Sequence, residues 1–219
     1  MITEHDVNSL IIVKKLGFIT AILSFIFYVT FDIAAIAGMT GVITSPFINS
    51  LSLYAPSLLL AYSYLGMTIA IHYDSISKVN IFSFCALALA VIYTTLNSIV
   101  YVIQVVIIAP SFLNNTFAMV SLFEMAANKP LYAVNGLAYT LMGFSTLFIS
   151  FSIKGKGIER KTKIALFIHG IVAPTVFGAL LYKAFFVLSA TVGITYPISA
   201  ILIAKYFASS RKELLQTNL

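Results

Sequence analysis

Apolar residues run along the chain in six long stretches, separated by short polar or basic turns. A helix needs about 20 apolar residues to cross the roughly 30 Å hydrocarbon core of a bilayer. We therefore predict an all-α integral membrane protein: a six-transmembrane-helix bundle with both termini cytoplasmic, formed as one domain over 1–219. The predicted spans are about 16–40, 54–73, 79–109, 131–153, 163–185 and 186–208, with a tight turn near Ala184.

Polar residues interrupt the apolar stretches at helical spacing. In "FIFYVTFDIAAIAGM" at 25–39, Asp32 follows Tyr28 by four residues, and both share one face with Ser24. A carboxylate at the centre of a spanning helix costs about 2.5–3.5 kcal/mol on insertion scales, so it normally faces the bundle interior. We expect Asp32 to point inward. Beside a lysine it would stay ionised, and without a cation burial would favour the protonated acid.

The third and fourth stretches carry polar stripes that rise to a similar depth. At about 1.5 Å per residue, Asp32 lies about 25 Å above the cytoplasmic edge and Asn97 about 24 Å above it, with Asn135 and Lys183 at nearly the same depth. We expect Asp32 to face Asn97, Tyr101 and Asn135 across the bundle. The stripes predict a polar, tyrosine-lined cavity in the outer half of the membrane. Its candidate ligand-binding residues are Asp32, Tyr28, Asn97, Tyr101, Gln104, Asn135, Tyr139 and Lys183. The alternative is that these side chains only hydrogen-bond between helices, at about 0.6 kcal/mol each.

Composition supports membrane residence. The chain is 60% hydrophobic and 9% charged, whereas soluble domains carry about 25% charged residues. Eleven of the thirteen Lys and Arg fall in the turns that would face the cytoplasm, and the two others are Lys129 and Lys183. This asymmetry predicts cytoplasmic termini. The net charge of +6 thus reports topology and indicates no nucleic-acid partner. The run "KGKGIERKTK" could also hold anionic lipid head groups, at about 1 kcal/mol per basic residue.

Several kinds of chemistry find no support in the sequence. The three histidines, His5, His72 and His169, form no i, i+4 pair, and Cys85 is the single cysteine, so we predict no metal site and no cofactor. The sequence has no phosphate-binding loop and no nucleophile elbow. We predict no catalytic residues, and an intramembrane enzyme acting on lipid is the least favoured class. "HYD" at 72–74 is interpreted as a solvated helix end.

Two prolines fall near the middle of the last two predicted spans. Pro174 and Pro197 each remove a backbone hydrogen bond, so each predicts a kink. In the longest connection, 110–130, we expect a short helix within 116–127 that lies at the interface or caps the bundle.

Two segments are informative as motifs: "KKLGFITAILSFIF" at the first span, and "GLAYTLMGFSTLFISFSIKGKGIERKTKIALFIHGI" across the fourth and fifth. In these segments the chain resembles an uncharacterised family of bacterial six-helix inner-membrane proteins, domain of unknown function 4386. It implies a bacterial inner-membrane location and brings no catalytic residues.

We expect a multi-pass membrane protein whose outward-opening cavity binds or translocates a small or amphiphilic ligand, with membrane lipid as its surroundings. The alternative class is a non-enzymatic accessory or sensory membrane protein whose polar stripes serve helix packing or a partner.

Overall fold

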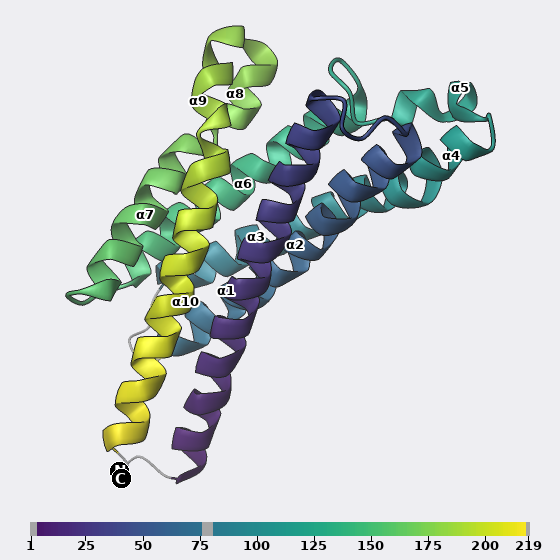
Figure 1. The fold of residues 1–219 in the computed structure, drawn as a ribbon. Helices are drawn as coiled ribbons and strands as arrows, with labels where there is room; N and C mark the ends of the chain where they lie inside the picture. Colours follow the sequence, from purple (N-terminus) through teal and green to yellow (C-terminus); the bar gives the residue numbers. More distant parts are fainter. Residues whose placement is uncertain (1–3, 76–80, 218–219) are drawn as a thin grey trace.

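Six long helices and several short ones make up the computed structural model, which describes residues 4–75 and 81–217, with side chains for 8–75 and 81–211. The side chains of His5, Lys78 and Lys212, and the predicted span start at 79–80, lie outside this description. The long helices are α1 (Glu4–Met39), α2 (Pro46–Ser75), α3 (Ile81–Ile103), α6 (Pro130–Ser152), α7 (Ile158–Val172) and α10 (Val192–Thr217) (Figure 1).

The prediction of six apolar helices is confirmed. The described residues contain six helical stretches that are long and apolar enough to cross a membrane, at Asn8–Met39, Pro46–Ser75, Ile81–Leu113, Pro130–Ser152, Ile158–Leu181 and Lys183–Arg211. The second stretch begins eight residues earlier than predicted, at Pro46. Ser45 accounts for this start, because its Oγ accepts a hydrogen bond of 3.4 Å from the backbone N–H of Ile48 and Pro46 suits the first helical position.

Short elements connect the long helices at one end of the bundle. After α3 come the π-helix η2 (Gln104–Ile108), α4 (Ala109–Leu113), α5 (Phe117–Val120) and the 3₁₀-helix η3 (Ser121–Phe123). The last two confirm the short helix expected within 116–127. Between α7 and α10 lie α8 (Thr175–Leu181), η4 (Lys183–Phe185) and α9 (Phe186–Ala190). We call this the distal end, and the end where α1 begins and α10 finishes the termini end (Figure 1).

The two prolines act differently. Pro174 separates α7 from α8, as the missing backbone donor predicts. Pro197 lies inside α10, which continues through it. The turn predicted near Ala184 is present as η4.

The long helices form a closed ring. Each packs against the long helices that precede and follow it in the chain, and α1 packs against α10, giving the order α1–α2–α3–α6–α7–α10. Helices α6 and α7 approach closely, since a β-carbon on Gly170 would lie 2.7 Å from the backbone nitrogen of Leu147. Only glycine permits this contact of helix backbones, which is a common way of packing helices in membranes.

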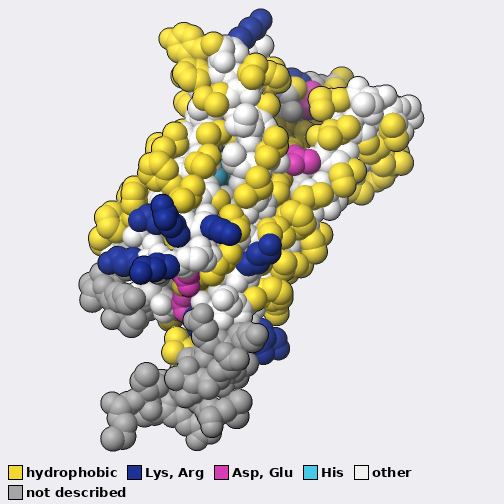
Figure 2. Space-filling view, turned by 60° about the vertical axis from the view of Figure 1, so that its left-hand side comes forward, with side chains coloured by type: hydrophobic (Ala, Val, Ile, Leu, Met, Phe, Trp, Pro, Cys, Tyr) yellow, Lys and Arg dark blue, Asp and Glu magenta, His cyan; other side chains and the backbone are white. Residues whose placement is uncertain are grey.

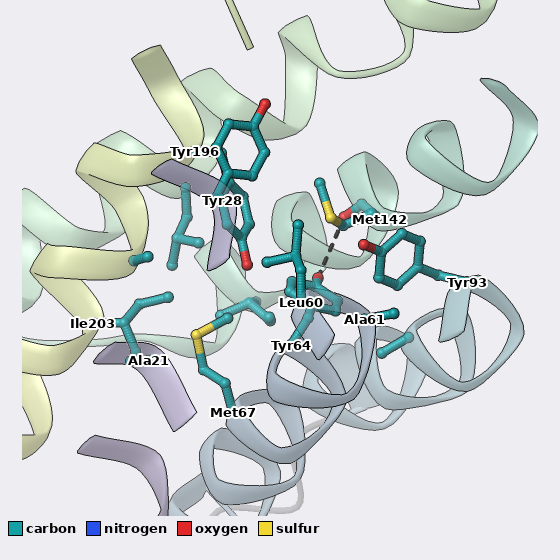
Figure 3. Packing of buried hydrophobic residues seen from close by; sticks show 14 of the residues in the cluster. Ala21, Tyr28, Leu60, Ala61, Tyr64, Met67, Tyr93, Met142, Tyr196 and Ile203 are labelled. Carbon is teal, nitrogen blue, oxygen red and sulfur yellow. Dashed lines mark hydrogen bonds between the residues drawn. The ribbon is translucent and has the colours of Figure 1, made fainter. Parts of the chain in front are cut away.

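The centre of the ring is filled by large side chains from all around it. Tyr64, Tyr93, Tyr101 and Tyr196 are each at most 1% exposed. The rings of Tyr28 and Tyr196 lie 4.7 Å apart between centroids, joining α1 to α10, and Figure 3 shows them side by side. On the face drawn in Figure 2, hydrophobic side chains cover much of the surface, and Lys and Arg side chains gather toward the termini end.

Candidate functional site

Four of the residues predicted to line a cavity meet across α3 and α6. Asn135 donates from Nδ2 to Asn97 Oδ1 at 3.2 Å and to the Tyr101 hydroxyl at 2.8 Å. The hydroxyls of Tyr101 and Tyr139 are 3.0 Å apart. All four side chains are at most 9% exposed. We call Asn97, Tyr101, Asn135 and Tyr139 the central network. These bonds tie α3 to α6, while the buried Nδ2 of Asn97 has no hydrogen-bond partner among the described residues.

Asp32 lies on a different side of the ring from the central network. It is half-buried on α1, and a β-carbon placed on Gly193 of α10 would be 3.7 Å from its Oδ2. Asp32 lies one turn beyond the buried Tyr28 on the same face of α1, and at this level the face borders α10. Within the described residues it makes no hydrogen bond and no ion pair with Asn97, Asn135 or any cation. The expected joining of this carboxyl to the amides is not what the structure shows.

Lys183 is also separate from Asp32. It is exposed in η4 and lines a groove of about 650 Å³ together with Lys129, Tyr132, Phe177 and Leu180. The sequence predicts a similar membrane depth for Asp32 and Lys183. Two residues at one depth can still lie on opposite sides of the helix ring, and these two do not contact each other. Lys129 itself is paired with Glu124 at 2.6 Å.

A cavity of about 300 Å³ opens at the distal end between α2 and the elements that follow α3. We call it the distal cavity. Its wall is formed by Pro46, Asn49, Ser50, Leu53, Tyr54, Gln104, Ile108, Phe112, Phe117 and Glu124. Asn49 and Ser50 each have a buried side-chain oxygen with no hydrogen-bond partner among the described residues. Asn49 Oδ1 faces α1, since a β-carbon on Gly38 would lie 2.4 Å from it. The mixture of aromatic and polar residues around the hollow makes this wall a candidate binding surface.

Gln104 builds the floor of the distal cavity. Its Nε2 donates to the Phe123 carbonyl at 2.6 Å, and its Oε1 accepts from the Met125 backbone N–H at 3.1 Å. Both ends of the amide are therefore engaged in holding the segment around η3 in place. Gln104 also begins η2, in which the Ala109 N–H bonds to the Gln104 carbonyl five residues back. Such π-turns are often found at functional sites.

Tyr54 joins the distal cavity to the central network. It lines the cavity, and its ring stacks on that of Tyr101 with centroids 6.0 Å apart and planes 22° apart. A ligand that displaced Tyr54 would therefore disturb Tyr101 directly.

The sequence reading missed Asn49, Ser50 and Glu124. The second span was predicted to begin at 54, which left 46–53 in a loop. The dipeptide Ser45–Pro46, a frequent helix start, was the signal that could have placed Asn49 and Ser50 on the helix. Glu124 has no comparable local signal, because its place in the cavity wall depends on how Gln104 holds the neighbouring Phe123 and Met125.

The interpretation of "HYD" as a solvated helix end is wrong. Asp74 forms an ion pair of 2.7 Å with Lys14, and both side chains are at most 10% exposed. Tyr206 donates a hydrogen bond to the other oxygen of Asp74. His72 Nδ1 lies 3.0 Å from Ser83 Oγ. The end of α2 is thus bound to α1, α3 and α10.

His169 is fully buried and lies at the interface of α7 and α10. Its Nδ1 is 3.0 Å from Thr195 Oγ1, and its ring packs edge-on against Tyr196. Among the described residues, no three His, Cys, Asp or Glu side chains form a group that could hold a metal ion.

Comparison with protein-family models, with curated proteins and with solved structures finds no match. The candidate site therefore has to be interpreted from its own chemistry.

Proposed function

We propose that the chain is a multi-pass membrane protein with six spans and both termini in the cytoplasm. The six long apolar stretches support the spans. The band of Lys and Arg toward the termini end supports the orientation (Figure 2), because cytoplasmic turns are enriched in these residues. The distal end then faces outward. A bacterial inner membrane is the setting that the sequence resemblance implies.

We further propose that the distal cavity binds a small amphiphilic ligand from the outer side. The observation that carries this proposal is a cavity of about 300 Å³ whose wall combines aromatic side chains with the polar residues Asn49, Gln104 and Glu124. That volume is at the lower end of small-molecule sites.

The cavity wall also defines the ligand's chemistry. The rings of Phe112 and Phe117 stack with centroids 4.6 Å apart, and together with Leu53 and Ile108 they offer an apolar surface. The Glu124 carboxylate is already paired with Lys129, so the wall carries little net charge. The ligand is a small molecule with an apolar or aromatic body and a hydroxyl or amine that donates hydrogen bonds.

The test is cysteine accessibility in a chain whose single native cysteine is replaced, Cys85→Ala. Ser50→Cys should react with a membrane-impermeant thiol reagent added from outside. Ser57→Cys is the matched control on the same helix, since Ser57 is completely buried and should stay unlabelled. 2-Phenylethanol and 2-phenylethylamine, used as probes, should slow the labelling of Ser50→Cys in a saturable manner.

A Ser50→Cys variant that labels no faster than Ser57→Cys would overturn the cavity. Labelling that neither probe slows would overturn the ligand chemistry while leaving the cavity in place.

The central network favours a second candidate function. Because Asn97, Tyr101, Asn135 and Tyr139 bond to one another, they also fit an accessory or sensory protein whose polar residues serve packing. Asn97→Cys and Asn135→Cys in the same background test the packing role of the central network. We expect both to be protected from the reagent, and the labelling of Ser50→Cys then distinguishes a binding protein from a scaffold.

A further inference from the structure

The basic turn between α6 and α7 folds into a groove of about 580 Å³ at the termini end. Its wall contains Lys154, Arg160 and Lys163, with Ile153, Ile164 and Phe167 beneath them and Gly155 at the turn. We call it the basic groove. The other two cations of this turn, Lys156 and Lys161, do not line it. Lys161 instead borders an apolar depression facing α10.

The residues of the basic groove are ordered along α7. Arg160, Lys163, Ile164 and Phe167 are spaced i, i+3, i+4, i+7 and therefore share one face of the helix. The two cations come in the first two turns, and the two apolar side chains follow toward the middle of the helix. All four side chains are exposed. This face changes from cationic to apolar within about 10 Å along the helix axis.

The cations of the basic groove are available for an external anion. No ion pair among the described residues involves Lys154, Arg160 or Lys163. Glu159 does not line the groove. The carbon atoms of its side chain lie close to Gly155, and its carboxylate interacts electrostatically with Tyr206. The N-terminus of α7 has no side-chain cap, so its free N–H groups add to the positive potential.

We infer that the basic groove binds the phosphate head group of an anionic membrane phospholipid, with an acyl chain lying along Ile164 and Phe167. Arg160 would hold the phosphate through paired N–H donors, and Lys154 and Lys163 would add charge. The order of cations and apolar residues along α7 matches the order of head group and chain in a lipid. The inference relies on the proposed membrane insertion and is independent of the distal cavity.

The experiment compares two double variants that remove the same charge from the same turn. Arg160→Gln/Lys163→Gln removes groove cations, and Lys156→Gln/Lys161→Gln removes cations outside the groove. The purified full-length protein, in a neutral detergent, is titrated with phosphatidylglycerol while its thermal unfolding midpoint is measured. Phosphatidylcholine and inorganic phosphate serve as separate arms.

We expect phosphatidylglycerol to raise the unfolding midpoint of the wild type in a saturable manner. The Lys156→Gln/Lys161→Gln variant should respond like the wild type, and Arg160→Gln/Lys163→Gln should bind at least about 10-fold more weakly. An equal loss in both variants would overturn the site, because net charge alone would then explain binding. An equal effect of phosphatidylcholine would overturn the head-group assignment, and an equal effect of inorganic phosphate would overturn the lipid as the source.

If Arg160→Gln/Lys163→Gln does not fold, Lys154→Gln replaces it as the groove variant, with Lys156→Gln as its partner. Retention of phosphatidylglycerol by these single variants in native mass spectrometry gives the same comparison. Failure here would leave the labelling of Ser50→Cys in the distal cavity unchanged, so the two proposals are tested separately.

Discussion

At the scale of single residues, Asp32 is the least compensated charge in the apolar part of the chain. It is half-buried on α1, close to Gly193, and among the described residues it has neither a hydrogen bond nor an ion pair. A carboxylate in this position lowers stability unless it binds something. The effect of the Asp32 carboxylate on the stability of the folded chain is therefore worth measuring.

We predict that Asp32→Asn raises the free energy of unfolding by up to about 1 kcal/mol, because it removes an unpaired charge while keeping the shape. The measurement is thermal unfolding of the purified protein in detergent. Asp74→Asn is the matched control and should destabilise, since Asp74 is paired with Lys14. Destabilisation by Asp32→Asn as well would show that the carboxylate has a partner in solution.

Pairing of the polar residues was predictable only in part. The depth estimate brought Asn97 and Asn135 together, and the structure joins them at 3.2 Å. The same estimate failed for Asp32 and Lys183, because equal depth does not give the order of helices around the ring. Gln104 was placed on the correct face, but its binding to the backbone of Phe123 and Met125 depends on a distal segment without periodicity.

At the scale of helices, the strongest polar contact is at the termini end. Asp74 joins α2 to α1 through Lys14 and to α10 through Tyr206. Breaking a buried ion pair by removing one partner usually costs 3–5 kcal/mol, whereas replacing both partners by apolar residues is often neutral. Removal of either Lys14 or Asp74 alone should therefore destabilise the fold, whereas replacement of both should cost little.

We predict that Asp74→Ala and Lys14→Met each lower the free energy of unfolding by about 3 kcal/mol. The double variant Lys14→Met/Asp74→Leu should recover to within about 1 kcal/mol of the wild type, because no charge is left unpaired. Tyr206→Phe should cost about 1 kcal/mol. Unfolding in mixed micelles measures all four. Additive losses in the double variant would contradict the pairing.

The helices themselves were predictable because apolar length is a strong signal. The ends of the helices were harder to predict. Helix α1 continues through Lys14 and Lys15, whereas the predicted first span begins at 16. Lys14 can lie in the helix because Asp74 neutralises it. Asp74 is 60 positions away in the sequence, so the local sequence around Lys14 cannot predict this ion pair.

At the scale of the whole molecule, charge and hydrophobicity divide along one axis. Hydrophobic side chains cover most of the visible surface, and the cations gather toward one end of it (Figure 2). The distal end carries Lys129 and Lys183, and Lys129 is neutralised by Glu124. This asymmetry is the basis of the proposed orientation, with the termini end in the cytoplasm.

We predict opposite labelling of two exposed positions in the Cys85→Ala background. Met119→Cys, at the distal end and 83% exposed in the native side chain, should react with an impermeant thiol reagent in intact cells. Lys156→Cys, in the turn before α7, should react only after permeabilisation. The reverse pattern would mean an inverted orientation, and labelling of both in intact cells would argue against insertion.

The ring order of the helices has one further consequence. Five of its six contacts join long helices that follow one another in the chain, so a connecting segment holds each of those pairs together. The sixth, between α1 and α10, has no such tether and is kept shut by side chains alone, among them the stacked rings of Tyr28 and Tyr196. Separation of α1 from α10 would therefore strain no connecting segment, and the carboxyl group of Asp32 borders this seam.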